Sequence, residues 1–215
     1  MDFDLSDEQR QLKDSVERLL AAKYADLKLR DTARAEATGY AAATWAQFAE
    51  LGLTAIPFAE EHGGLGAGLV ETMLVMEAIG RNLAVEPYLA TVVLAGGVMR
   101  HGASSAQQTE IIPKIIDGSM TLALAHQERQ SRFDLFDVAT TAKPDGKGGY
   151  TLDGEKMVVL NGDSADKILV SARTAGERRD GRGVTLFLVD GQAQGLTRKG
   201  SPTQDGGRSA DVTLK

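Results

Sequence analysis

The chain has 215 residues, of which 42% are hydrophobic and 25% are charged, and its formal net charge is −6. These values are typical of a globular protein with one large or two small domains, and an acidic balance without a block of like charges argues against a nucleic-acid partner. The absence of cysteine excludes disulfides and thiolate metal sites. The charged N-terminus is unlike a signal peptide and no apolar run is long enough to cross a membrane, so we expect a cytoplasmic protein.

Residues 1 to about 118 have the apolar spacing of amphipathic helices. Ser6 and Gln9 predict a capping box at the start of the first helix, since each side chain can bond the backbone N–H of the other residue. Over 69–80 the pattern places Met73 and Met76 on one apolar face, which predicts that both lie in the core. The other predicted helices lie around Trp45 with an end at Gly52, after Pro87, and from Ser104 or Ser105 to Gly118.

After residue 118 the pattern changes to short strand-like runs separated by Gly, Asp and Asn. The runs are "MTLALA", "DVATTAKP", "YTLDG", "EKMVVLNG", "DKILVSART" and "GVTLFLVD", and the C-terminal "SADVTLK" also has the pattern of a strand. "PDGKGG" and "DGE" predict hairpin turns, and no helical segment lies between the strands to make parallel crossovers. The sequence therefore predicts an all-helical domain over 1–118 and an antiparallel β domain over 119–215.

The segment "AEEHGGLGAGL", residues 59–69, raises the question of a phosphate-binding loop. Such a loop needs a preceding strand and the order GxxxxGK[ST] or GxGxxG, and this segment has neither. It lies between two predicted helices, where glycine lets the backbone turn sharply. These residues favour a structural turn over a nucleotide site.

Three segments, in this order, resemble the acyl-CoA dehydrogenase family of flavoenzymes: "FAELGLTAIPFAEEHGGLGAG", an apolar helix ending in "EAIGR", and "LDGEKMVVLNGDSADKILVSART". The family's (I/V)P-x-E-x-GG-x-G turn is matched at Ile56, Pro57, Glu60, Gly63, Gly64 and Gly66. Its LNGxKxWITNG segment and the following "AR" are matched at Leu152, Gly154, Lys156, Asn161, Gly162, Ala172 and Arg173. "MDFDLSDEQ", "ERQSR" and "PTQDG" resemble the small subunit of two-component dehydrogenases of the pimeloyl-CoA type.

The resemblance implies a helical N-terminal domain, a β-barrel-like middle domain and a C-terminal four-helix bundle, and the sequence is expected to stop near the end of the second. It implies FAD as cofactor, loss of the α-proton of an acyl-CoA thioester and transfer of the β-hydride to the flavin. The family's catalytic base lies in the bundle, so no catalytic residue is assigned and the 215-residue chain is expected to be inactive alone.

The resemblance also assigns binding residues, and several depart from the family pattern. His126 and Gln127 stand at the threonine and glutamate of the family's TEP turn along the flavin, and Glu128 stands at its proline. Val158 replaces the tryptophan that flanks the ring, and Leu160 replaces the threonine that bonds flavin N5, a bond that leucine cannot make. The expected FAD contacts are His126, Gln127, Val158, Val159 and Leu160, and the expected substrate contacts are Ser131 and Arg132.

Structural explanations stand beside these assignments. His126 ends an apolar strand and can be an ordinary satisfied or exposed histidine, while Arg129 and Arg132 can either lie in a solvated loop or meet coenzyme A or another subunit. No metal site is expected, because His62 and His101 lie in unrelated helical segments.

Three functions stay open on this sequence. The first is a component of an FAD-dependent acyl-CoA dehydrogenase that performs α,β-dehydrogenation. The second is a non-catalytic structural subunit of a heteromeric dehydrogenase, favoured by Val158 and Leu160. The third is another flavin oxidoreductase, such as an acyl-CoA oxidase or a monooxygenase. The expected partners are an acyl-CoA substrate, an electron acceptor such as an electron-transfer flavoprotein, and further subunits of a homo- or hetero-oligomer that include a large dehydrogenase subunit.

Overall fold

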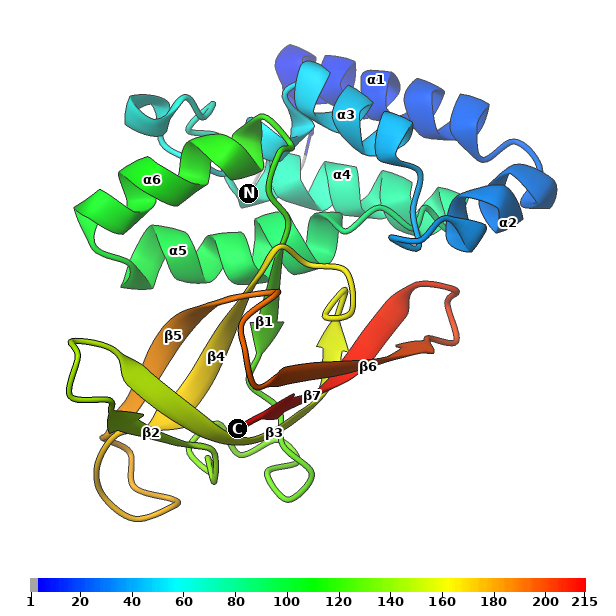
Figure 1. Cartoon of the computed structure of the whole chain (residues 1–215). Helices are drawn as coiled ribbons and strands as arrows, with labels where there is room; N and C mark the ends of the chain where they lie inside the picture. The colour runs from blue at the N-terminus through cyan, green and yellow to red at the C-terminus, as the bar shows by residue number, and fades with distance from the viewer. Residues whose placement is uncertain (1–3) are drawn as a thin grey trace. The chain divides into compact units, whose positions relative to one another are not determined.

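The computed structural model describes residues 4–215, so the first three residues of "MDFDLSDEQ" lie outside the described residues. The chain forms two compact units (Figure 1). The first runs to Met120 and includes Gln204–Gly207, and the second comprises Thr121–Thr203 and Arg208–Lys215. The fold class predicted from the sequence, a helical part followed by a β part, is confirmed.

The first unit is helical. Its helices are α1 (Asp7–Lys23), α2 (Leu27–Ala35), α3 (Ala42–Glu50), α4 (Leu69–Asn82), α5 (Gly96–Gly102) and α6 (Ser105–Ile116). Two short 3-10 turns, η1 (Leu53–Ala55) and η2 (Glu60–His62), precede α4, and a π-helical segment, η3 (Leu89–Ala95), leads into α5. Helix α1 packs along α4, and α5 packs against α6.

The helix starts follow the local chemistry that the sequence predicts. The Gln9 N–H donates to Ser6 Oγ at 3.2 Å and the Ser6 N–H donates to Gln9 Oε1 at 2.9 Å, which confirms the capping box. Ser104 caps α6 in the same way with Gln107. Helix α2 was not predicted; it is short, Ala33 is its buried residue, and Leu27 and Leu29 near its start are exposed.

The core of the first unit corrects one expectation. Met73 is 54% exposed, so the prediction that it lies in the core is wrong, and Met76 is half-buried. Helix α4 is apolar on more than one side, and the face that packs inward is centred on Val75 and Ile79 instead. Periodicity alone could not decide between these faces, since both have helical spacing.

The glycine segment is a turn between η2 and α4. The N–H groups of residues 64–67 all donate to carbonyls of residues 55–59, at 2.7 to 3.0 Å. A Cβ at Gly64 would lie 2.0 Å from the carbonyl oxygen of Phe58, so the backbone there approaches closer than any side chain allows. The amides are used within the turn, as the structural interpretation of this segment predicts.

The second unit is a curled, seven-stranded sheet (Figure 1). Its strands are β1 (Leu122–Ala125), β2 (Thr141–Pro144), β3 (Tyr150–Leu160), β4 (Lys167–Arg173), β5 (Val184–Asp190), β6 (Leu196–Pro202) and β7 (Arg208–Leu214). The strand order is β1-β4-β2-β3-β7-β6, and β5 pairs with β4.

The sheet is mixed. Strands β2 and β3, β3 and β7, β6 and β7, and β4 and β5 pair antiparallel, but β1 pairs with β4 in parallel, with Leu122 opposite Lys167. The prediction of a purely antiparallel sheet is therefore corrected, because β1 and β4 are parallel. The chain between these two strands forms the β2–β3 hairpin and not a crossover helix. The predicted turn at "DGE" is wrong, because Gly154 lies within β3 and pairs with Leu214.

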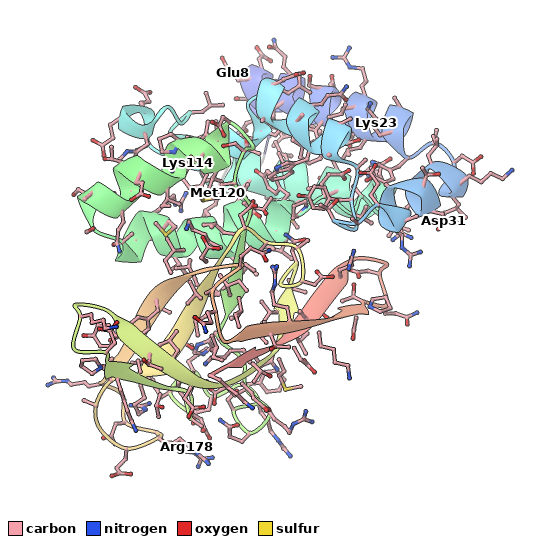
Figure 2. The ribbon with its side chains drawn as sticks, viewed as in Figure 1. Glu8, Lys23, Asp31, Lys114, Met120 and Arg178 are labelled. Atoms are coloured by element: carbon pink, nitrogen blue, oxygen red, sulfur yellow. The ribbon has the colours of Figure 1, made fainter. Side chains whose placement is uncertain are left out.

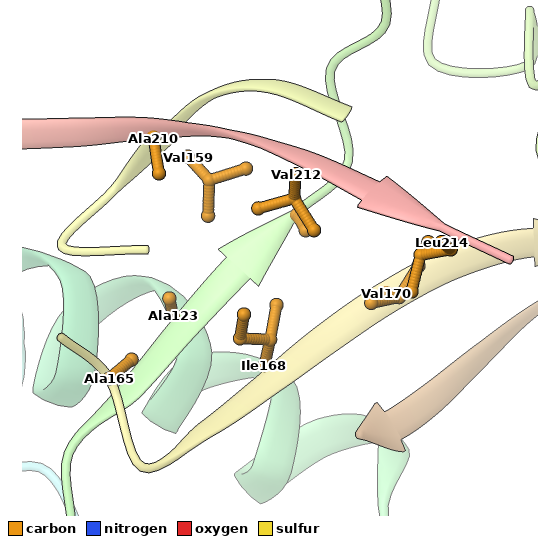
Figure 3. Close-up of a cluster of buried hydrophobic side chains, with 9 residues drawn as sticks. Ala123, Val159, Ala165, Ile168, Val170, Ala210, Val212 and Leu214 are labelled. Carbon is orange, nitrogen blue, oxygen red and sulfur yellow. The ribbon is translucent and has the colours of Figure 1, made fainter. Parts of the chain in front are cut away.

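The core of the second unit collects alternate residues of several strands, as the two-residue period of a strand requires (Figure 3). Strands β1, β4 and β7 supply most of it, and Val159 of β3 joins them. The cluster comprises Ala123, Ala125, Val159, Ala165, Ile168, Val170, Ala210, Val212 and Leu214.

Candidate functional site

A β-bulge in β3 shapes the segment "KMVVL". The pairing of β3 with β7 shifts register between Lys156 and Val159. Val158 has a φ of 53°, which is rare for a β-branched residue. The bulge leaves Val158 47% exposed while the Val159 side chain beside it is in the core. Bulges re-aim side chains in this way and are frequent next to binding sites.

The chain after β1 joins this bulge through the backbone. The Met157 N–H donates to the Gln127 carbonyl at 2.9 Å, so His126 and Gln127 lie beside the segment that holds Val158. Gln127 is exposed and His126 is half-buried. The structure thus brings together the segment after β1 and the part of β3 that hold the expected FAD contacts. The Val159 side chain is enclosed in the core, so this residue can offer a ligand only its backbone.

A buried ion pair lies directly beneath these residues. Lys156 Nζ lies 2.6 Å from Glu128 Oε1, and the two side chains are 0% and 3% exposed. The N–H groups of Ala139 and Thr140 donate to the same carboxylate at 2.8 and 3.0 Å. Burial opposes ionisation of Glu128, but the hydrogen bonds from Lys156, from Thr140 and from the other donors outweigh it and lower its pKa to about 2.

The sequence analysis missed this role of Glu128, because the resemblance aligned this residue with the proline of the family's TEP turn. A lysine at an inward-facing position of a strand signals that a buried anion must lie nearby, since an unpaired buried charge is costly. The spacing could not tell which acidic residue supplies it, because the partner comes from a connection 28 residues earlier.

Lys156 also connects the ion pair to His126. Its Nζ lies 3.0 Å from Ser171 Oγ and 3.3 Å from the His126 carbonyl oxygen. Ser171 Oγ lies 3.0 Å from His126 Nδ1. Burial lowers the pKa of His126, and the nearby Lys156 charge lowers it further, which favours the neutral imidazole.

The two expected substrate contacts have different surroundings. Ser131 is buried, and its hydroxyl accepts from the Glu128 N–H at 3.0 Å and lies 2.9 Å from the Glu128 carbonyl, so it closes a local turn. Arg132 is exposed, with a φ of 49°. Of the two side chains, that of Arg132 is the one free to meet a substrate.

Arg173 orders the loops at this end of the sheet. Its guanidinium donates to the carbonyls of Phe136 and Arg178 at 2.8 Å each and of Arg182 at 2.9 Å. Arg178, labelled in Figure 2, lies on the loop after β4, and its Nε is 2.8 Å from the buried Asp137 carboxylate. The "AR" match of the sequence thus marks a structural residue that ties the loop after β1 to the loop after β4.

A groove of about 820 Å³ opens elsewhere on the sheet. Its walls include Tyr150, Leu152, Phe187, Val189 and Leu196, and no expected site residue lines it. Among residues 4–215 there is no cluster of three His, Asp or Glu side chains that could hold a metal ion. In the same range, no helix is both long and apolar enough to span a bilayer.

Comparison with known proteins adds the family to this geometry. Residues 6–119 match the N-terminal domain of acyl-CoA dehydrogenases, and residues 123–214 match the middle domain. The mitochondrial isovaleryl-CoA dehydrogenase of Pongo abelii is 32% identical over 189 residues, which are 86% of this chain and 44% of that protein. Benzylmalonyl-CoA dehydrogenase of Aromatoleum aromaticum is 31% identical over 201 residues, 92% of this chain and 51% of that protein.

A solved structure, the ChsE4-ChsE5 complex from Mycobacterium tuberculosis, matches with a TM-score of 0.85 and 25% identity and covers 100% of this chain and 56% of that one. The chain therefore spans about half the length of the relatives it matches. Two family domains matched in order over nearly all residues show that the chain belongs to the acyl-CoA dehydrogenase family.

Proposed function

We propose that the protein is a component of a flavin-dependent acyl-CoA dehydrogenase that introduces an α,β double bond into an acyl-CoA thioester. The observation that carries this proposal is the match of both family domains in order, over 6–119 and 123–214. The names of the two curated relatives, isovaleryl-CoA and benzylmalonyl-CoA dehydrogenase, indicate the same reaction class on different acyl groups. The acyl group that this chain would serve is open.

FAD would be held by His126, Gln127, Val158, Leu160 and the backbone of Val159. Exposed Val158 and half-buried Leu160 offer an apolar surface for a flat ring. Within the described residues, His126 Nε2 has no hydrogen-bond partner, so this nitrogen is available to a ligand. These residues fit a flavin except at position 160, where no hydroxyl is present. When bound, FAD supplies the hydride acceptor, and the role of these residues is to hold and orient it.

The test is to isolate the protein together with the subunits that accompany it and to measure FAD content and oxidation of acyl-CoA thioesters with an artificial electron acceptor. We expect FAD in the complex and turnover of at least one class of thioester. A complex that holds FAD but oxidises none of a broad thioester panel would overturn the proposed reaction. Electron-transfer flavoprotein is the natural acceptor we propose, and it can replace the dye in the same assay.

A second candidate is a non-catalytic subunit that supports a competent partner. Val158 and Leu160 favour it, because neither side chain can donate a hydrogen bond to a flavin. A matched solved structure of two differently named chains, the ChsE4-ChsE5 complex, also supports a heteromeric arrangement. Purification with and without a large partner subunit separates the two candidates, since full activity of the lone protein would exclude the supporting role.

A further inference from the structure

The buried lysine has its three protons fully used. A protonated Lys156 ammonium carries three N–H donors. Three acceptors lie within reach: Glu128 Oε1 at 2.6 Å, Ser171 Oγ at 3.0 Å and the His126 carbonyl at 3.3 Å. Each N–H donor therefore has one acceptor, and Ser171 Oγ accepts a hydrogen bond from Lys156.

This arrangement directs the single hydroxyl proton of Ser171. Ser171 is 0% exposed, and besides Lys156 its hydrogen-bond neighbour among residues 4–215 is His126 Nδ1 at 3.0 Å. Since Ser171 Oγ accepts from Lys156, its own proton can satisfy a lone pair on Nδ1. Burial lowers the pKa of His126 most; of the two charged groups that face it, Lys156 lowers the pKa further and Glu128 opposes this, so a second proton on the ring is disfavoured.

We propose that Ser171 and Lys156 are positioning residues that hold His126 in the neutral tautomer with its proton on Nε2. The ring then presents one fixed hydrogen-bond donor, and the backbone of the adjacent Gln127 is bonded to Met157, the neighbour of Val158 in the chain. The ligand chemistry that suits this donor is a carbonyl or ring-nitrogen acceptor at the edge of a flat heteroaromatic group. With the proposed function, on which this last step rests, that group is the flavin, and His126 supplies a donor on a face where Leu160 has none.

The tautomer itself can be tested without any cofactor. Two-bond ¹H–¹⁵N correlation spectra of ¹⁵N-histidine-labelled protein near neutral pH distinguish the two neutral tautomers and the charged ring. The sequence has three histidines, so the His126 signals are identified by their loss in His126→Gln. We expect the pattern of an Nε2-protonated ring for His126. A proton on Nδ1, or an equal mixture of tautomers, in the unmodified protein would overturn the proposal.

A pair of variants tests the positioning residue. Ser171→Ala removes the donor to Nδ1, so we expect the two ring-nitrogen shifts of His126 to move toward each other as the tautomers mix. Ser171→Thr keeps the hydroxyl and is expected to restore the Nε2-protonated pattern. An unchanged His126 pattern in Ser171→Ala would overturn the proposal. If the alanine variant does not fold, the spectrum of the unmodified protein still shows which ring nitrogen of His126 carries the proton, and so still tests the proposal.

FAD binding separates this inference from the proposed function. If the two tautomers are equally populated in Ser171→Ala, half of the rings present the Nε2 donor, so the affinity for FAD should be about 2-fold weaker than in the unmodified protein. If the tautomer is as expected and the complex binds no FAD, the flavin proposal fails and the positioning role stands. If FAD binds and His126 is protonated on Nδ1, the positioning role fails and the flavin proposal stands.

Discussion

Glu128 and Lys156 are the residues on which the site depends most, because each is charged and neither reaches water. Taking two charges out of water is expensive, and the pair is tolerable because further donors satisfy the carboxylate and further acceptors satisfy the ammonium. The same contacts hold the start of the loop after β1 against β3. At this scale the role of His126 and Val158 in binding FAD stays a prediction, although a backbone hydrogen bond joins the two segments that hold them. The sequence did not predict the ion pair, which forms between segments distant in the chain.

We expect Glu128→Gln to destabilise the protein by about 3–5 kcal/mol at neutral pH, because it leaves a buried lysine charge without its partner. The pKa of Glu128 is about 2 in the folded protein, whereas that of an ordinary glutamate in water is 4.5. Its stabilising contribution is therefore fully present above pH 4.5 and is lost as the pH falls toward 2. The difference in unfolding free energy between the variant and the unmodified protein should shrink over this window.

Urea unfolding at several pH values measures this difference. Glu155→Gln is the matched control, since Glu155 is the exposed neighbour of Lys156 in the same strand and its loss should change stability by less than about 0.5 kcal/mol. A difference for Glu128→Gln that stays constant from neutral pH down to pH 2 would show that the carboxylate is not ionised in the folded protein.

At the scale of elements, the sequence predicted those features that neighbouring residues decide. The capping box at Ser6, the helix cap at Ser104 and the turn at 59–69 depend on residues a few positions apart, and the structure has them. The predictions that failed depend on distant partners. Gly154 continues a strand because β7 pairs with it, and the parallel partner of β1 follows more than 40 residues later.

Two glycine substitutions test the account of the glycine turn. Gly64→Ala should destabilise the first unit by about 3 kcal/mol, because the new methyl group would meet the Phe58 backbone and the turn would have to shift. Gly80→Ala is the control: nothing lies within 4 Å of its added Cβ, and alanine favours the helix, so a gain of up to about 1 kcal/mol is expected. Thermal unfolding followed by circular dichroism measures both, and equal effects of the two substitutions would contradict the tight approach at Gly64.

At the scale of the whole molecule, the family is known and the assembly is a proposal. The sequence predicted a helical part followed by a β part, and the resemblance to the family was strong because separate motifs occur in the right order. The relatives extend well beyond the matched region, which is 44% and 51% of their lengths.

We expect the isolated chain to bind FAD weakly. The resemblance to the family implies that further helices and a neighbouring subunit also contact the flavin, and residues 1–215 alone would not supply those contacts. Absorbance of the purified chain after desalting in excess FAD should show far less than one flavin per chain. The complex with its partner subunits is the positive control, and retention of near-equimolar FAD by the chain alone would contradict this expectation.

The position of β7 has a consequence for how the protein is made. This strand lies between β3 and β6, so each of these earlier strands has its hydrogen-bonding neighbour among residues 208–214. During translation, β3 and β6 emerge from the ribosome with that edge unsatisfied, whereas the last helix of the first unit is complete at Ile116. The pairing of β3 with β7 closes late, because distant segments such as Leu160 and Ser209 must meet before any bond forms, whereas β6 and β7 form a local hairpin. The β unit is thus exposed to mispairing for as long as β7 is still being synthesised.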